Sequence, residues 1–216
     1  ANINDRNNYG NTALMLASGE GNLELVKYLV ENGADINAKD ENGTTALIMA
    51  TINRNSEAVK ILVKNGADIN AKDNDYNTAL ILAYEYGNLE ILKFLVEHGA
   101  DINAKDKDGN TALMYAAKEF YLINDDEIVK FLVENGANIN AKNKDGDTPL
   151  ILASKNWNSK AVKFLVENGA DINAKDKDGN TALSLAREES LQDFGYLRKE
   201  EKINEIIKIL MEAGAK

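Results

Sequence analysis

The chain has 216 residues, of which 25 are Lys or Arg and 35 are Asp or Glu, so its formal net charge is -10. Hydrophobic residues make up 44% of it, enough for a packed core, and no apolar run reaches the roughly 18 residues of a membrane span, so we expect a folded, soluble protein. The acidic excess argues against nucleic acid and anionic membranes as partners, and the absence of cysteine excludes disulfides and thiolate metal sites.

A short motif recurs along the whole chain. Thr-Ala-Leu or Thr-Pro-Leu begins at spacings of 33, 33, 33, 37 and 33 residues, at Thr12, Thr45, Thr78, Thr111, Thr148 and Thr181. A second motif, Gly-Ala-(Asp/Asn)-Ile-Asn-Ala-Lys, begins at Gly33, Gly66, Gly99, Gly136 and Gly169. Self-similarity at such a period is the signature of a repeat array. We therefore predict a single domain over residues 1–216, with repeats at about 7–39, 40–72, 73–105, 106–142, 143–175 and 176–216.

Each repeat predicts the same elements in the same order, as the second repeat illustrates. A short helix follows Thr45, whose hydroxyl can cap its start, and runs to about Thr51. Asn55 is the expected start of a second helix with a broad apolar face, and that helix ends before Gly66, where a left-handed residue is favoured. An extended segment and a glycine-bearing turn then lead to the next Thr. Neither helix can bury its apolar face alone, so neighbouring repeats must stack.

These residues resemble the ankyrin repeat. The resemblance covers nearly the whole chain and rests on D-x-x-G-x-T-A/P-L followed by A-S-x-x-G-N-L-E-L-V-K-Y-L-V-E-N-G-A-D-I-N-A. It implies an all-α ankyrin-repeat solenoid of helix-turn-helix units joined by extended β-turn loops. In that fold the turn tips and the first helices line a concave surface, and the second helices form the back.

The chain departs from the family motif Thr-Pro-Leu-His. The Pro is retained only at Pro149, and the His position holds other residues, namely Met15, Ile48, Ile81, Met114, Ile151 and Ser184. Apolar contact is therefore expected to replace the hydrogen bonds that this His makes between repeats.

Residues that depart from the repeat are the candidates for partner recognition, because the regular positions encode the scaffold. Exposed Tyr, Trp and Arg side chains dominate the binding energy at protein interfaces. The residues favoured as partner contacts are therefore the departures near the ends of the first helices and at one turn tip. The predicted contact residues are Ile52, Arg54, Tyr76, Tyr84, Tyr86, Lys118, Lys155 and Trp157. For Tyr86 and Trp157, packing against neighbouring helix ends is an equal alternative, and Tyr115, at a Leu-type position, is expected in the core.

Tyr76 occupies a position that holds Gly in the five other repeats. A non-Gly residue in the left-handed region costs about 1–2 kcal/mol, so either this turn has changed type or an aromatic side chain is useful at its tip.

Insertions lengthen the fourth and sixth repeats, within 118–125 and around 187–202. The apolar residues of the first insertion, 120–123, are expected to pack on the next repeat or to contact a partner, and the second insertion is expected to form a polar cap. The first repeat is as apolar as the internal ones, so we expect a preceding segment or a second copy of the chain to cover it.

The residues needed for catalysis or metal binding are missing from the sequence. Its single histidine, His98, aligns with Asn residues at a helix end and is expected to contact the last carbonyls of that helix. A zinc site with the usual spacing of Cys and His ligands is impossible with one His and no Cys. The Asp-Lys-Asp-Gly turns lack the acid that a calcium-binding loop needs. We therefore expect no enzymatic activity, no cofactor and no metal.

The sequence predicts a module that binds a protein partner on the concave face of turn tips and first helices. Two alternatives remain open: a structural role through self-association as a homodimer at the apolar first repeat, and a modification substrate, since the Asn of Asp-Ile-Asn can resemble a hydroxylation target (Asn37, Asn70, Asn103 and Asn173). The compartment is not defined by the sequence.

Overall fold

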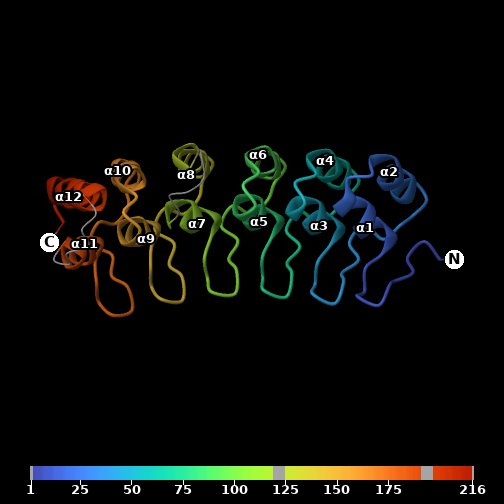
Figure 1. Cartoon of the computed structure of the whole chain (residues 1–216), viewed down its shortest axis with the longest axis horizontal. Helices are drawn as coiled ribbons and strands as arrows, with labels where there is room; N and C mark the ends of the chain where they lie inside the picture. Colours follow the sequence, from blue (N-terminus) through green and yellow to red (C-terminus); the bar gives the residue numbers. More distant parts are fainter. Residues whose placement is uncertain (1, 119–124, 191–196, 216) are drawn as a thin grey trace. The chain divides into compact units, whose positions relative to one another are not determined.

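The computed structural model describes residues 2–118, 125–190 and 197–215, and these residues form twelve α-helices and no strand. The helices come in pairs, one pair to each repeat (Figure 1). Their bounds are α1 (Ala13–Glu20), α2 (Leu23–Glu31), α3 (Ala46–Ile52), α4 (Ser56–Lys64), α5 (Ala79–Glu85), α6 (Leu89–Glu97), α7 (Ala112–Lys118), α8 (Asp125–Glu134), α9 (Pro149–Lys155), α10 (Ser159–Glu167), α11 (Ala182–Ser190) and α12 (Leu197–Glu212).

Two compact units divide the chain, Ala1–Lys107 with α1 to α6 and Asp108–Lys216 with α7 to α12. Within each unit the first helices of successive repeats lie side by side, and the second helices lie in a layer beside them. The loops between repeats project from the other side of the first helices (Figure 1). A repeat therefore presents second helix, first helix and hairpin loop in that order.

Threonine caps start the first helices as the sequence predicts. The hydroxyl oxygen of Thr45 accepts a hydrogen bond from the backbone N–H of Ile48 at 3.2 Å, and Thr78 caps Ile81 in the same way at 3.4 Å. Such a bond satisfies one of the backbone donors that a helix start leaves without a partner. The predicted cap is confirmed.

Asparagine precedes the second helices α2, α4, α6 and α10, but the side chain of Asn55 is placed differently from the other three. Asn22 and Asn88 accept hydrogen bonds from the third residue of their helices, Leu25 and Ile91, at 3.1 and 2.9 Å. The Asn55 side chain makes no such bond, and its amide donates to the carbonyl oxygens of the preceding repeat at Ser18 and Gly19 instead. The predicted helix start is confirmed, while this side chain links two repeats rather than capping its own helix.

The core runs between the two helices of each repeat and between neighbouring repeats. In the third repeat Leu80, Ile81, Leu92 and Leu95 are each at most 1% exposed. The position where the family carries His is buried as well, at Met15, Ile48, Ile81, Met114 and Ile151. Apolar contact replaces the His hydrogen bonds at these positions, as predicted.

Two rows of hydrogen bonds join neighbouring repeats within each unit. At the hairpin tips the backbone N–H of Asn74 donates to the carbonyl oxygen of Asn42 at 2.9 Å, and Lys177 donates to Asp145 at 2.8 Å. At the start of the loops, side-chain oxygens of one repeat accept from the backbone of the next, as Asn37 does from Asp68 at 2.7 Å. The same bond recurs at Asn4, Asn70 and Asn140. These bonds fix the register of the loops.

Much of both predicted insertions lies outside the described residues, at 119–124 and 191–196. The expected packing of 120–123 belongs to these ranges, as does the middle of the expected polar cap, whereas its residues Arg187, Glu188, Glu200 and Glu201 are described and exposed. Across the described residues, no helix is long and apolar enough to cross a membrane.

Candidate functional site

Four of the predicted contact residues lie where first helices of the Ala1–Lys107 unit end. Ile52 is the last residue of α3 and is half-buried, while Arg54 follows it in an exposed turn. Tyr86 ends α5 with 37% of its surface exposed. Tyr84, two residues earlier, is only 1% exposed and is part of the core. We therefore remove Tyr84 from the predicted contact residues, because its side chain does not reach the surface.

Tyr76 lies apart from this group, in the hairpin that precedes α5. Its side chain is 57% exposed, and the ammonium of Lys72 lies 5.6 Å from the centre of its ring, within the range of a cation–π contact. Its φ is 64°, close to the 76° of Gly43 at the same position. The turn has therefore kept its type, and the tyrosine adopts the conformation that glycine has in the other repeats.

Two more non-glycine residues adopt the left-handed conformation, and both are predicted contact residues. Arg54 has a φ of 60° and Trp157 a φ of 56°, at positions equivalent to Gly21 and Gly87. Backbone strain at exposed positions is a common mark of functional sites. Trp157 is half-buried, so part of its side chain reaches the surface.

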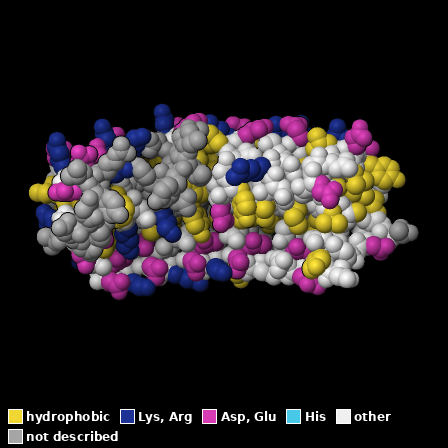
Figure 2. Space-filling view, viewed as in Figure 1, with side chains coloured by type: hydrophobic (Ala, Val, Ile, Leu, Met, Phe, Trp, Pro, Cys, Tyr) yellow, Lys and Arg dark blue, Asp and Glu magenta, His cyan; other side chains and the backbone are white. Residues whose placement is uncertain are grey.

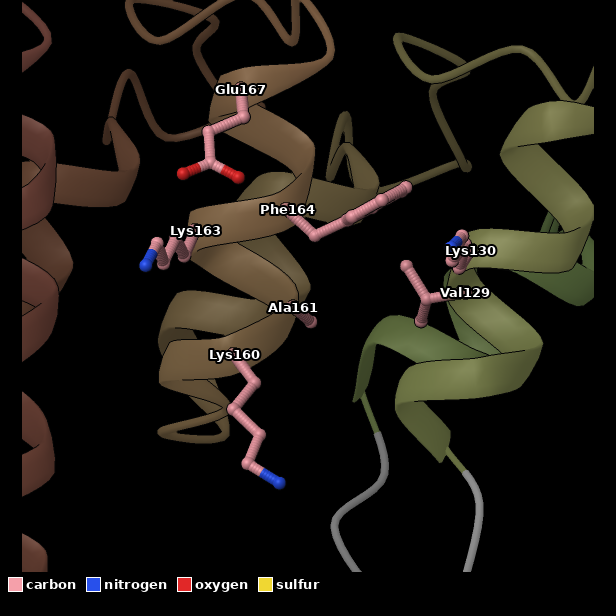
Figure 3. Close-up of a pocket in the computed structure, with 7 residues that line it drawn as sticks. All are labelled: Val129, Lys130, Lys160, Ala161, Lys163, Phe164 and Glu167. Carbon is pink, nitrogen blue, oxygen red and sulfur yellow. The ribbon is translucent and has the colours of Figure 1, made fainter.

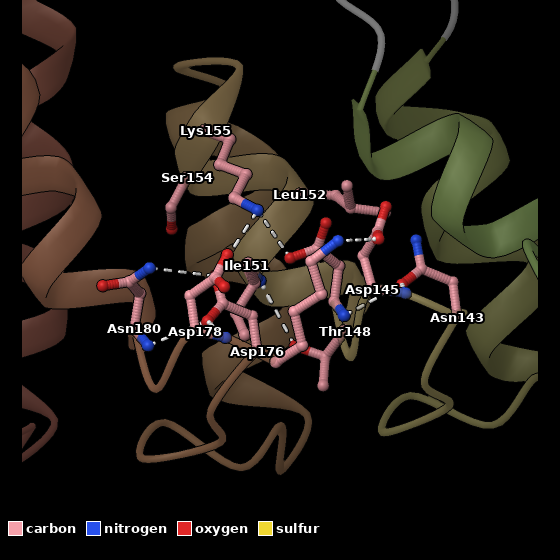
Figure 4. Close-up of polar contacts among 12 residues, drawn as sticks. Asn143, Asp145, Thr148, Ile151, Leu152, Ser154, Lys155, Asp176, Asp178 and Asn180 are labelled. Carbon is pink, nitrogen blue, oxygen red and sulfur yellow. Dashed lines mark hydrogen bonds and ion pairs between the residues drawn. The ribbon is translucent and has the colours of Figure 1, made fainter.

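Lys118 and Lys155 occupy equivalent positions, at the ends of α7 and α9 in the Asp108–Lys216 unit, but their surroundings differ. Lys118 is exposed. The Lys155 ammonium lies 2.6 Å from Asp147 and 3.6 Å from Asp176, whose side chains are 8% and 3% exposed (Figure 4). Lys155 therefore joins the fifth repeat to the sixth through two buried carboxylates.

Hydrogen bonds hold Asp176 ionised at this place. Burial alone would raise its pKa, but the Asn180 backbone and side chain and the Asp178 backbone donate to the carboxylate, and Lys155 adds a positive charge. The pKa of Asp176 is lowered as a result.

A cavity of about 230 Å³ opens between the hairpins and first helices of the fourth and fifth repeats. Met114, Tyr115 and Leu152 form its apolar part, and Lys118 lies at its edge. The polar part consists of Asp108, Asn110, Asn143, Asp145 and Asp147. Tyr115 was expected in the core, and it is half-buried with one side on this cavity.

The sequence-based selection missed Asp147, although a signal for it exists. The same position holds Asn or Thr in the other repeats, at Asn11, Thr44, Asn77, Asn110 and Asn180. An acid here is a departure from the repeat like those that were selected. Its role follows from the contact with Lys155.

Acidic and basic side chains alternate along the hairpin tips of the later repeats, as Figure 2 shows at the left of its lower edge. The ammonium of Lys177 lies 2.6 Å from Asp145, and the hydrogen bond between them lowers the pKa of Asp145 and raises that of Lys177. In the other unit Lys107 pairs with Asp75 at 2.8 Å. These pairs are exposed, so the tips carry solvated and mutually compensated charge.

The described residues contain no group of three or more His, Asp or Glu side chains placed to hold a metal ion. His98 ends α6, and its Nδ1 lies 2.8 Å from the carbonyl oxygen of Phe94, on whose ring it stacks. This is the helix-end contact that the sequence predicts. Asn65 and Asn168 make the same contact with their side-chain amides, at 2.7 and 2.8 Å.

Comparison with known proteins agrees with this geometry. The sequence matches the family described as ankyrin repeats in three copies, over residues 1–73, 71–143 and 121–216. Among solved structures, it is similar to the crystal structure of an ankyrin repeat domain from Acinetobacter baumannii AYE, with 36% identity and a TM-score of 0.80. That match covers 94% of this chain and 98% of the other. No curated protein matches the sequence.

The chain is an all-α protein built of stacked helix pairs. It belongs to the ankyrin repeat family, because the family match spans the whole chain. The predicted fold class is confirmed. Ankyrin repeats generally mediate protein–protein interaction, which is the class of function that the sequence predicts.

Proposed function

We propose that the protein binds a protein partner on the surface formed by the hairpin tips and first helices. The observation that carries this proposal is that seven residues departing from the repeat, most of them aromatic or basic, are exposed or half-buried on or beside this surface. They are Ile52, Arg54, Tyr76, Tyr86, Lys118, Lys155 and Trp157. Hydrogen bonds between repeats fix the loops in advance, so little ordering is needed on binding.

Two features of this surface indicate the chemical character of the partner it would bind. The cavity of about 230 Å³ combines an apolar part at Met114 and Leu152 with a polar part of amides and ion-paired carboxylates, a combination suited to a long side chain with a polar end. The exposed aromatic rings of Tyr76 and Tyr86 suit apolar or cationic groups. A partner segment of mixed polar and apolar character fits both.

The test uses a partner captured by the wild-type protein and then purified. Replacing Tyr86 and Trp157 together with alanine is expected to weaken binding by about 30-fold or more, the effect of losing at least one hot-spot residue. Lys27→Glu, an exposed change on the second helix α2, is the matched control and should leave affinity within about twofold. Unchanged affinity of the double variant, with its unfolding curve intact, would refute the proposed surface.

Self-association through the first repeat is a second candidate function, and a specific observation favours it. Leu25 on α2 is 39% exposed, whereas the equivalent residues Ala58, Ile91, Ile128 and Ala161 are at most 4% exposed. Leu16 and Tyr28 are also exposed, at 44% and 60%, and Figure 2 shows hydrophobic side chains over this end of the chain. An apolar patch of this kind suits a second copy of the same surface.

Light scattering across a range of protein concentrations tests this second function. The wild-type chain is expected to approach the mass of a dimer at high concentration, and Leu25→Glu is expected to remain a monomer. A monomeric wild type at the highest concentration would count against self-association.

A further inference from the structure

Asparagine is followed directly by glycine at five places in the chain. These Asn-Gly pairs begin at Asn32, Asn42, Asn65, Asn135 and Asn168. In such a pair the backbone nitrogen of the glycine can attack the side-chain carbonyl carbon of the asparagine, because glycine has no Cβ to obstruct the approach. All five asparagines are exposed, so water reaches each of them. Exposure therefore does not distinguish one pair from another.

The glycine backbone does not distinguish the pairs either. All five glycines have a φ between 76° and 93°. The N–H of Gly43 donates to the carbonyl oxygen of Asp40 at 3.1 Å, and the N–H of Gly33 donates to that of Val30 at 3.2 Å. The equivalent bonds of 3.2, 3.1 and 3.2 Å are made by Gly66, Gly136 and Gly169. The attacking nitrogen is therefore held alike at all five places.

The asparagine side chain separates Asn42 from the other four, which lie directly after second helices. At the end of α10 the side-chain amide of Asn168 donates to the carbonyl oxygen of Phe164 at 2.8 Å, and Figure 3 shows the ring of Phe164 pointing toward α8. The same bond, at 2.7, 2.7 and 2.8 Å, is made by Asn32, Asn65 and Asn135. Each of these side chains must leave its helix before it can meet the glycine nitrogen.

Asn42 lies instead at the tip of the hairpin between α2 and α3. Its backbone is held there, because its N–H donates to the Asp40 carboxylate at 2.8 Å and its carbonyl oxygen accepts from Asn74 at 2.9 Å. Its side-chain amide makes no hydrogen bond to any residue that the structure describes. The side chain can therefore turn toward Gly43 while the hairpin stays folded.

We propose that Asn42 is a site of spontaneous deamidation, with water as the co-reactant. The Gly43 nitrogen gives up its proton and bonds to Cγ of Asn42, and the bond from Cγ to the side-chain nitrogen breaks, so that this nitrogen takes up a proton and leaves as ammonia. Water then opens the cyclic imide. Opening at Cγ gives aspartate, and opening at the main-chain carbonyl carbon gives iso-aspartate, in which the chain runs through the former side chain.

The reaction changes the charge of the hairpin tip, whether or not a partner binds there. The position of Asn42 holds an acid in the four repeats that follow, at Asp75, Asp108, Asp145 and Asp178. Asp75 is compensated by Lys107 of the next repeat at 2.8 Å, whereas the residue at the position of that lysine beside Asn42 is Asn74. Deamidation therefore adds a carboxylate with no lysine at the position that faces it, and one negative charge to the net charge of -10.

The test is incubation of the native protein in mildly alkaline buffer, followed by trypsin digestion and mass spectrometry. Cleavage after Lys and Arg places the five pairs in separate peptides, namely 28–39, 40–54, 65–72, 131–142 and 164–175. Deamidation exchanges an NH₂ group for OH and raises the peptide mass accordingly. Peptide 40–54 is expected to gain this mass at least about fivefold faster than the other four, the effect of one net hydrogen bond on the asparagine side chain. Equal rates, or a slower rate for 40–54, would overturn the proposal.

The same incubation in urea separates the effect of the fold from that of the local sequence. Asn32, Asn42, Asn135 and Asn168 all stand between Glu and Gly. Once urea has removed the hydrogen bonds to the helix carbonyls, these four asparagines are expected to react at similar rates. A lead of peptide 40–54 that persists in urea would refute the role of the free side chain.

Two variants assign the reaction to the residue named. Asn42→Gln, whose longer side chain would have to close a larger ring, is expected to abolish the mass gain of peptide 40–54. A gain that persists in this variant would place the reaction at Asn53, in the same peptide, and refute the proposal. Asn42→Asp supplies the peptide with a normal aspartate, so the iso-aspartate product of the wild type should appear as a second peak of equal mass. A wild type without that second peak would contradict a cyclic imide intermediate.

Discussion

Replacing Lys155 with alanine tests how the fifth and sixth repeats are joined. The change leaves the carboxylates of Asp147 and Asp176, 8% and 3% exposed, without the ammonium at 2.6 and 3.6 Å. Breaking a fully buried pair costs about 3–5 kcal/mol. The side chain of Lys155 is 34% exposed, and Asn180 and Asp178 still donate to Asp176, so we expect a loss of about 1–2 kcal/mol in the free energy of unfolding at pH 7.

The pH dependence of this loss identifies its cause. The pKa of Asp176 is lowered in the folded state, so its ionised form stabilises the fold above its ordinary value of 3.8, and that stabilisation disappears as the pH falls through the lower folded value. The difference between wild type and Lys155→Ala should therefore shrink below about pH 4, because protonated carboxyl groups no longer require a positive partner.

Urea unfolding followed by the fluorescence of Trp157, the single tryptophan of the chain, measures this difference close to the change. Lys118→Ala is the matched control, because Lys118 ends α7 as Lys155 ends α9 but is exposed, and it should change stability by less than about 0.5 kcal/mol. A loss of less than about 0.5 kcal/mol for Lys155→Ala at pH 7, or a loss that is the same at pH 3, would refute the reasoning.

Two further predictions concern the backbone and the links between repeats. Arg54→Gly is expected to raise the free energy of unfolding by about 0.5–1 kcal/mol, because the relief of backbone strain at a φ of 60° exceeds the entropy that glycine adds to the unfolded chain. A lower melting temperature of this variant would contradict the prediction. Asn55→Ala is expected to lower the free energy of unfolding by about 1–3 kcal/mol, because the carbonyl oxygens of Ser18 and Gly19 lose the hydrogen bonds of 2.9 and 2.7 Å that the Asn55 amide donates. Asn22→Ala, which removes only a cap, should cost less in the same urea titration.

The fold could be predicted from the sequence because the same local signals recur in every repeat. Thr45 at a helix start and Gly66 beyond a helix end are local signals with one physical meaning each, and six copies make their spacing unmistakable. The sequence also indicated the positive φ at Tyr76, since glycine fills that position in the other repeats.

The candidate site was less predictable, because it depends on which side chains meet between repeats. Tyr84 departs from the repeat as clearly as Tyr86 does, yet one is buried and the other is exposed, and the difference is two positions on one short helix. Lys155 was selected because it departs from the repeat at the end of a first helix, whereas its ammonium lies between two buried carboxylates from separate loops. Pairings of this kind require the three-dimensional register of the hairpins.

The hydrogen bonds between hairpins have a consequence for how such a protein changes over time. Most of the bonds that set the register at the tips join backbone atoms, as between Asn74 and Asn42, and the bonds at the loop starts use one asparagine in a repeat. The remaining tip side chains can therefore be exchanged with little effect on folding. Mutation can change which partner the surface recognises without changing the scaffold. A library randomised at the tip positions should therefore yield folded members with new specificities.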